Sequence, residues 1–356
     1  MANGQLKVLE ISSYPPPLAG WGMRVFVVKR ALESQGHVCE VLNIGKGRFL
    51  VNRDFIPVFG AIDYAKKVLK HRLKGFTVHM HLNGDSPKGF MLTTLALTIS
   101  LLTFRRPVIT FHAGPVQKYF PQSEAPLLTP LYKYIFSAAR HIICNSDAEK
   151  KAIMGYGVPA KKCRPIQAFT KQYLEFDRIQ LSDELEDFYK KYKNVICTYV
   201  FYRPQYFLEE MMEGLGILFK ERPDTAMVMM GPDRDQGAII DLLRKNGIED
   251  RVLIIGNQAH DAFLTVMAKS KLYLRTHWKD GVSSSVLESL ALGVPVVACE
   301  NDRRPPSTVT FENQNVDEMV EKLRYVLDNH QEAVQAIQKP DIPDTVTDEI
   351  AVLAGE

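Results

Sequence analysis

One segment, residues 271–299, constrains the fold most, because a strand, a turn, a helix and a second strand follow one another within it. Alternating apolar residues predict the first strand, and a continuous apolar run predicts a buried second strand. Serines before the helix offer N-cap oxygens, and Gly followed by Pro ends it. The expected parts are a strand from Lys271 to Thr276, a loop at Gly281, N-cap residues Ser283 to Ser285, a helix from Val286 to Leu292 that Gly293 and Pro295 end, and a strand from Val296 to Cys299.

Two carboxylates lie on either side of this turn. Asp280 precedes it, and Glu288 follows one turn into the helix, so both can face the same crevice. A helix start also presents unpaired N–H groups and a positive dipole end, which favour phosphate. One carboxylate could therefore bind sugar hydroxyls and the other ribose hydroxyls. The alternative interpretation is an ordinary strand–turn–helix with a solvated Asp and a surface Glu.

The spacing of these carboxylates resembles a known signature. The residues from Asp280 to Val297 are similar to the donor-site motif of retaining glycosyltransferases with the GT-B fold, family 4, where two Glu residues stand eight apart. In this chain Asp280 stands in place of the first Glu, so the carboxylate is carried on a shorter side chain. The resemblance extends from Val8 to about Leu327. It implies an α/β protein of two Rossmann-like domains, each a doubly wound parallel sheet, that face a central cleft.

The length of 356 residues also fits two domains of about 150 residues each. Alternation of strands and helices begins at Lys7 and starts again at Asn194, which is typical of parallel sheets. We place the linker at 168–171. The expected parts are an acceptor-binding domain over 1–168, a donor-binding domain over 169–330, and a C-terminal helix and tail over 331–356 that, as the resemblance implies, would cross back to the first domain.

Charge is unevenly distributed along the chain. Residues 1–150 hold 19 Lys and Arg against 9 Asp and Glu, whereas 151–356 hold 25 against 32. The basic half could face anionic membrane lipid, nucleic acid or the acidic half of the same chain. Nucleic acid is disfavoured, because the basic residues follow no recognisable binding pattern. With no visible signal peptide and no apolar run long enough to span a bilayer, we expect a cytoplasmic protein, with peripheral contact at the inner membrane face as an option.

Two features of the first half match the family. Gly20 and Gly22 resemble the family's Gly-rich loop, which closes on the donor phosphates and the acceptor. A dinucleotide fingerprint would need a third Gly. His112, at a predicted strand end, matches the His that contacts the transferred sugar, which implies a catalytic role. His79 and His81 could form a metal pair, but no third ligand has suitable spacing, so we expect hydrogen bonds and no metal.

The second half carries the expected donor residues. Asp233 and Asp235 are interpreted as loop charge, although they superficially match a metal-binding Asp-x-Asp motif. The family's phosphate-binding Arg and Lys are replaced by Phe201 and Tyr206, so Arg203 is the expected substitute, with Arg275, Lys279 and the Arg303–Arg304 pair in reserve. The resemblance, with Arg203 as this substitute, assigns catalytic roles to His112 and Asp280, and donor binding to Gly20, Gly22, Arg203, Gly256, Asn257, Asp280, Gly281, Val282, Ser283, Ser284 and Glu288.

Together, the residues and the resemblance predict a metal-independent retaining hexosyltransferase without a cofactor. It would move a sugar from a UDP- or GDP-linked donor to a hydroxyl of a glycan or lipid-linked glycan, in the synthesis of cell-surface polysaccharide or glycoconjugates. One alternative is a GT-B nucleotide-sugar epimerase or phosphorylase. Another is a non-catalytic GT-B partner subunit, which the missing Arg and Lys favour.

Overall fold

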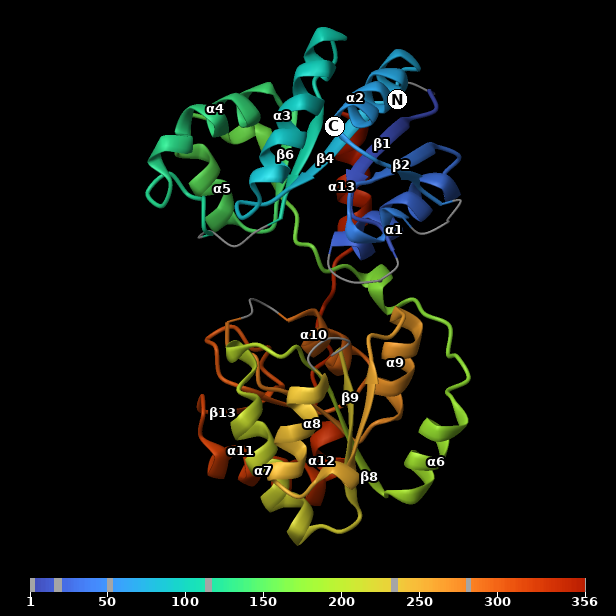
Figure 1. The fold of residues 1–356 in the computed structure, drawn as a ribbon, viewed down its shortest axis with the longest axis vertical. Helices are drawn as coiled ribbons and strands as arrows, with labels where there is room; N and C mark the ends of the chain where they lie inside the picture. Colours follow the sequence, from blue (N-terminus) through green and yellow to red (C-terminus); the bar gives the residue numbers. More distant parts are fainter. Residues whose placement is uncertain are drawn as a thin grey trace. The chain divides into compact units, whose positions relative to one another are not determined.

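The computed structural model describes residues 4–15, 21–49, 54–112, 117–231, 236–279 and 283–355. The chain divides into two compact units. The first unit comprises Met1–Gln172 with Pro343–Glu356, and the second comprises Tyr173–Ile342. Each unit is built around a parallel sheet with helices packed on its faces (Figure 1).

The first unit contains a seven-stranded sheet of order β3-β2-β1-β4-β5-β6-β7. Its central strands are buried on both faces, as expected for a parallel sheet covered by helices, but β1, β4 and β5 also carry buried polar side chains. The strand order reverses between β1 and β4. The elements are β1 (Lys7–Ser12), α1 (Trp21–Ser34), β2 (Val38–Asn43), β3 (Ile56–Pro57), α2 (Ala61–Leu73), β4 (Thr77–Leu82), α3 (Pro87–Leu102), β5 (Val108–Phe111), α4 (Thr129–Ala138), β6 (His141–Cys144), α5 (Asp147–Met154), β7 (Cys163–Pro165) and α13 (Thr345–Ala354).

The second unit contains a six-stranded parallel sheet of order β10-β9-β8-β11-β12-β13. Its order reverses between β8 and β11, where ligands of open α/β sheets bind beyond the carboxyl ends of the strands. The elements are α6 (Asp183–Lys191), β8 (Asn194–Tyr199), α7 (Leu208–Glu221), β9 (Thr225–Met230), α8 (Gln236–Lys245), β10 (Val252–Gly256), α9 (His260–Lys269), β11 (Leu272–Arg275), α10 (Ser284–Ala291), β12 (Val296–Cys299), β13 (Val309–Phe311), α11 (Val316–Asp328) and α12 (His330–Gln335).

The predicted fold class, two doubly wound parallel-sheet domains, is confirmed. The predicted strand at Val296–Cys299 has the observed bounds of β12, and β1 and β8 begin at Lys7 and Asn194, where the alternation is predicted to begin. Gly293 has φ +78° just beyond α10, as its predicted place at the helix end requires. Within the described ranges, no helix combines the length and apolar character needed to span a bilayer.

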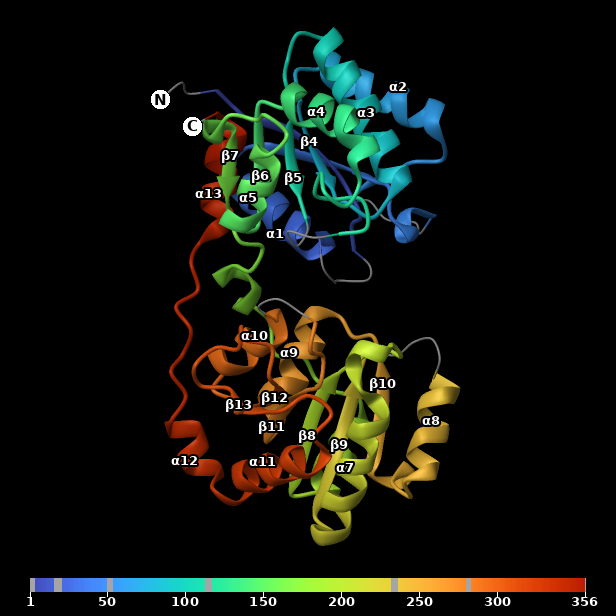
Figure 2. The same cartoon turned by 90° about the vertical axis from the view of Figure 1, so that its left-hand side faces the viewer.

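The C-terminal helix belongs to the first unit and packs on α1 (Figure 2). A buried ion pair joins the two helices: Arg24 Nε lies 2.6 Å from Glu349 Oε2, and both side chains are at most 2% exposed. Two further bonds run from the guanidinium of Arg24 to Oγ1 and the carbonyl oxygen of Thr345, at 2.8 and 2.7 Å. The N- and C-terminal parts of the chain are therefore joined through charges that water does not reach.

We expect Arg24→Met to destabilise the first unit by about 3–5 kcal/mol, because it leaves the Glu349 carboxylate buried without its cation. The chain has two Trp residues, one in each unit, so in a Trp278→Phe background Trp21 fluorescence reports denaturation of the first unit. Lys171→Met is the matched control, since it removes an exposed pair with Asp344 in the same region. It should cost about 1 kcal/mol or less. Equal losses in the two variants would contradict the importance of the buried pair.

Candidate functional site

The candidate donor site lies at the carboxyl ends of β8, β10 and β11 in the second unit. Glu288, one turn into α10, is almost fully buried, and its Oε1 lies 3.0 Å from Nε2 of His260. His260 is the first residue of α9, and the ring of Tyr173 meets it edge-on. The Glu288 carboxylate is therefore held in one orientation by a residue that sequence reasoning did not identify. His260 is distant from Glu288 in the chain, so no spacing signal connects them.

The start of α10 differs from the prediction in one respect. Ser283 is the N-cap residue, but its side chain makes no capping hydrogen bond, and the helix begins at Ser284, two residues earlier than expected. The Ser283 and Ser285 hydroxyls instead lie 3.0 Å apart, and Tyr273 OH donates to Ser285 Oγ at 2.8 Å. The predicted N-cap oxygens are therefore wrong, because the buried Tyr273 phenol needs a partner.

Two guanidinium groups flank the aromatic pair Phe201 and Tyr206, which stands where the resemblance led us to expect an Arg and a Lys. Phe201 and Tyr206 meet edge to face, with ring centroids 6.1 Å apart. The exposed Arg203 lies 5.3 Å from the centroid of Phe201. The buried Arg275, at the end of β11, lies 5.3 Å from the centroid of Tyr206, and its Nη1 donates to the Tyr199 carbonyl at 3.1 Å. The structure thus brings Arg275 beside the same aromatic pair as the predicted Arg203.

The loop after β10 packs closely against the neighbouring strands. Gly231 N donates to the Gly256 carbonyl at 2.9 Å, and Tyr199 OH donates to Asn257 Oδ1 at 3.1 Å. Gly231 has φ +104°, and a Cβ there would lie 2.3 Å from the Val200 carbonyl oxygen. This position therefore requires Gly, and the close backbone packing positions Gly256 and Asn257 at the sheet edge.

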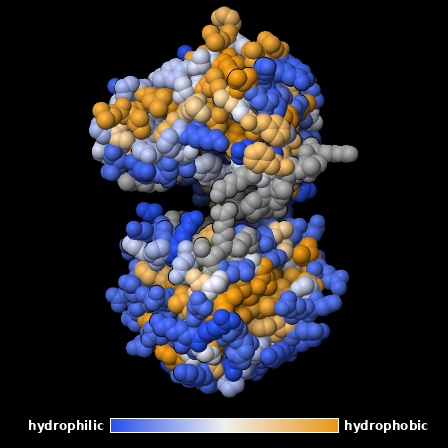
Figure 3. All heavy atoms as spheres, viewed as in Figure 1, coloured by the Kyte–Doolittle hydropathy of each residue, from blue (hydrophilic) through white to orange (hydrophobic). Residues whose placement is uncertain are grey.

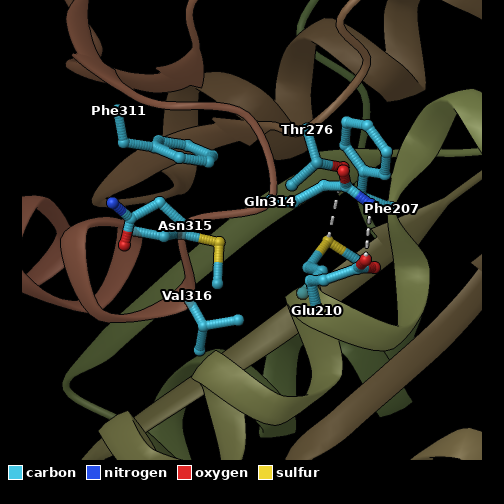
Figure 4. Close-up of a pocket in the computed structure, with 9 residues that line it drawn as sticks. Phe207, Glu210, Thr276, Phe311, Gln314, Asn315 and Val316 are labelled. Atoms are coloured by element: carbon cyan, nitrogen blue, oxygen red, sulfur yellow. Dashed lines mark hydrogen bonds between the residues drawn. The ribbon is translucent and has the colours of Figure 1, made fainter.

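A small pocket beside this edge does not coincide with the predicted site. Its cavity volume is about 10 Å³, which leaves room for about one water molecule. Figure 4 shows Phe311 on one side and Phe207 and Thr276 on the other. This volume is below the roughly 300–1,000 Å³ of ordinary ligand pockets, so it does not suit a whole nucleotide sugar. Its lining contains none of the predicted site residues: Phe207, Glu210, Met211, Thr276, Phe311, Gln314, Asn315, Val316 and Met319.

In the first unit, His112 follows β5 and is 6% exposed. Trp21, the first residue of α1, stacks on its ring with centroids 4.6 Å apart and planes 14° apart. Gly22 is the next residue of α1, and a Cβ there would make only ordinary contacts, 3.5 Å from Pro15. Packing among the described residues therefore does not by itself require Gly at position 22.

A buried polar network lies behind His112. His112 Nε2 is 2.7 Å from His81 Nδ1, and His81 Nε2 is 2.8 Å from Glu10 Oε2. His79 joins the network through Nδ1, 3.0 Å from Glu10 Oε1, and through Nε2, 2.7 Å from Thr110 Oγ1. These residues come from the adjacent strands β1, β4 and β5, whose parallel register places alternate side chains on one face.

The charge state of this network follows from its burial and its partners. Burial raises the pKa of Glu10, but the charge of His79 and hydrogen bonds from both histidines outweigh it and lower that pKa to about 2. Burial lowers the pKa of His79, yet attraction to Glu10 raises it overall. Burial and the charge of His79 lower the pKa of His81. Burial is the main reason that the pKa of His112 lies well below its usual value, and the charges of His81 and His79 also lower it.

Glu10 also supplies the third potential metal ligand that sequence reasoning did not find for His79 and His81. One ligand atom from each of the three residues lies within 4.8 Å of the others. However, their nitrogen and oxygen atoms already pair with one another and with Thr110 at hydrogen-bonding distances. The hydrogen-bonding interpretation accounts for this arrangement.

Other predicted residues, Gly20, Asp280, Gly281, Val282, Asp233 and Asp235, lie outside the described residues.

Comparison with known proteins gives two family matches. Residues 18–169 match the model "Glycosyltransferase Family 4", and residues 186–340 match "Glycosyl transferases group 1". No curated protein matches the sequence. With the fold, the two matches support a GT-B glycosyltransferase.

Several solved structures share the whole fold at low sequence identity. Anabaena HepE in complex with UDP and glucose is 15% identical, covering 98% of this chain and 100% of its own, with a TM-score of 0.67. Sucrose-phosphate synthase from Thermosynechococcus elongatus is 15% identical, covering 98% of each chain, with a TM-score of 0.68. A putative UDP-N-acetylglucosamine 2-epimerase from Listeria monocytogenes is 14% identical, covering 99% and 95%, with a TM-score of 0.64.

Proposed function

Because residues 18–169 and 186–340 match glycosyltransferase family models and the fold is GT-B, we propose that the chain is a retaining family 4 hexosyltransferase. It would use a nucleotide sugar and glycosylate a hydroxyl of a glycan or lipid-linked glycan. The observation that carries the proposal is the Glu288 carboxylate, oriented by His260 near the start of α10. The UDP and glucose bound by HepE support a UDP-linked donor.

In this mechanism each group has a distinct task. Glu288 Oε2 would accept hydrogen bonds from the ribose hydroxyls, while Asp280 and His112 would contact the transferred sugar. Arg203 and Arg275 would stabilise the charge that grows on the departing diphosphate, as a metal ion does in other enzymes. The departing phosphate would take the acceptor proton, so no protein base is required. This division of tasks needs neither a metal nor a cofactor.

The ribose assignment predicts different effects for the two carboxylates. A thermal-shift panel of UDP- and GDP-sugars would first select the donor, since a ligand at 100 times its Kd stabilises the fold by about 2.7 kcal/mol. Glu288→Ala should then weaken UDP binding at least about tenfold, because it removes charge-assisted hydrogen bonds. Asp280→Ala should leave UDP affinity unchanged and slow sugar transfer.

Calorimetric titration with UDP measures this difference. Glu321→Ala, which removes an exposed carboxylate of α11, is the control. The affinities should be the same in excess chelator, because the proposal invokes no metal. Wild-type UDP affinity in Glu288→Ala would refute the ribose assignment.

The cation assignment predicts that Arg203 contributes to turnover and little to stability. Arg203 is exposed, so Arg203→Ala should leave the melting temperature unchanged while lowering kcat/KM by about 10²-fold. Arg203→Lys should lose less, because it keeps the charge but not the bidentate fork. UDP release from the selected UDP-sugar, with and without glycan acceptors, is the measurement.

Two outcomes would redirect this assignment. Unchanged turnover in Arg203→Ala, with a large loss in Arg275→Lys, would transfer the phosphate role to the buried Arg275. Absence of nucleotide-sugar binding and turnover in the wild type would favour the partner-subunit alternative, for which Phe201 and Tyr206 in place of a cation pair are the specific observation.

We further propose that the first unit contacts an anionic membrane, where lipid-linked acceptors reside. Apolar and basic residues alternate on the exposed face of α2 and continue at the end of α3. Leu73 is 75% exposed and Phe104 is 97% exposed. Arg105 Nη1 donates to the Gly75 carbonyl at 2.7 Å, which joins the ends of both helices. Figure 3 shows apolar and hydrophilic side chains intermixed on this unit. The surface comprises Ile62, Lys66, Leu69, Lys70, Leu73, Lys74, Leu102, Phe104, Arg105 and Arg106.

Pelleting with vesicles of phosphatidylcholine and phosphatidylglycerol tests this surface. Wild-type protein should bind at low salt and dissociate as salt increases, because each basic residue contributes about 1 kcal/mol that ions screen. A Lys70→Gln, Lys74→Gln double variant should weaken binding about thirtyfold. The matched control, Lys190→Gln with Lys191→Gln on α6, should bind as wild type. Failure of the wild type to pellet at low salt would exclude the membrane contact.

A further inference from the structure

In the network behind His112, the positions of the protons decide which nitrogen of each histidine ring donates a hydrogen bond and which accepts one. Glu10 has no solvent exposure. His79 Nδ1 lies 3.0 Å from its Oε1 and 2.9 Å from its Oε2, and His81 Nε2 lies 2.8 Å from Oε2. A carboxylate can only accept hydrogen bonds, so both of these nitrogens must carry a proton. His81 Nε2 is therefore a donor, and in a neutral ring its Nδ1 is left with a lone pair.

The same reasoning extends to His112. Its Nε2 lies 2.7 Å from the lone pair of His81 Nδ1, so Nε2 of His112 must be the donor. The two rings are nearly coplanar, with planes 14° apart and centroids 5.0 Å apart, as expected for imidazoles joined edge to edge. Trp21 covers one face of His112. The ring is thus held on one edge and one face, and its Nδ1 takes no part in the relay.

We propose that Glu10 and His81 are positioning residues that hold His112 in the Nε2-protonated tautomer, so that Nδ1 accepts a hydrogen bond from a hydroxyl of the transferred sugar. The hydrogen bond between His112 Nδ1 and the sugar rests on the proposed function. The relay itself rests on the three side chains and would exist without any ligand. His79 supplies the balancing positive charge beside Glu10, and its Nε2–H donates a hydrogen bond to Thr110 Oγ1.

Nitrogen NMR of ¹⁵N-histidine-labelled full-length protein tests the relay directly. The chain has nine histidines, and His112→Gln identifies the His112 signals by their loss. We expect wild-type His112 to show a protonated Nε2 and a lone pair on Nδ1. Glu10→Gln and His81→Leu should both raise the population of the opposite tautomer, because each removes the bias toward Nε2–H. Thr110→Val is the matched control, since it breaks the network beyond His79 and should leave His112 unchanged.

Ligand affinity provides a second readout that a merely structural role would not move. With UDP-glucose and UDP as the two probes, Glu10→Gln should weaken UDP-glucose about threefold to tenfold, the loss of roughly one hydrogen bond. UDP, which lacks the sugar, should bind as in the wild type. Equal weakening of both probes would indicate general damage and would overturn the sugar contact.

The outcomes separate the relay from the proposed function. A wild-type His112 protonated on Nδ1, or a tautomer that neither Glu10→Gln nor His81→Leu changes, would overturn the relay. So would one equivalent of bound metal in the wild type that is lost in Glu10→Gln, since a metal would occupy the same lone pairs. Absence of binding of both probes to the wild type would refute the proposed function and the sugar ligand. The tautomer, measured without ligand, would still decide the relay.

Discussion

Two buried carboxylates, Glu10 and Glu349, impose the constraint on which the first unit depends. Neither is more than 1% exposed, and an unpaired carboxylate in such a place costs several kcal/mol. Glu10 pairs with His79 and Glu349 with Arg24, and His79 Nδ1 is 3.9 Å from Glu349, so the two pairs form one electrostatic group. Because Glu349 lies on α13, the chain must return to the first unit to complete this group.

In the second unit, too, a buried carboxylate at the sheet edge is paired with another side chain. Its buried carboxylate, Glu288, pairs with the first residue of α9 rather than with an Arg. The cations stand to either side of an aromatic pair, Arg203 in the loop after β8 and Arg275 at the end of β11. A glycosyltransferase with this arrangement would draw part of its phosphate-binding charge from the loop after β8 and part from the neighbouring strand β11.

Sequence reasoning succeeded where a pattern is repeated over several residues. The apolar run of β12 predicted its bounds, because parallel strands are buried on both faces. It did not identify β3 and β13, which have two and three residues and carry too little pattern. The prediction named Ser283 as an N-cap residue correctly, but it placed the helix start two residues too late and misassigned the hydroxyl. A Ser hydroxyl can form hydrogen bonds with several different partners. Here the Ser283 hydroxyl pairs with Ser285, which also accepts a hydrogen bond from Tyr273 on another element.

By itself, the sequence determined the two doubly wound domains and the position of Glu288 one turn into a helix, because both depend on periodicity and local spacing. Only the tertiary structure decided that His260 holds Glu288 and that Glu10, His81 and His112 form one chain of hydrogen bonds. His81 lies 71 residues from Glu10 and 31 from His112 in the sequence. These three side chains meet because parallel strands align in a fixed register, and that register is set by the sheet as a whole.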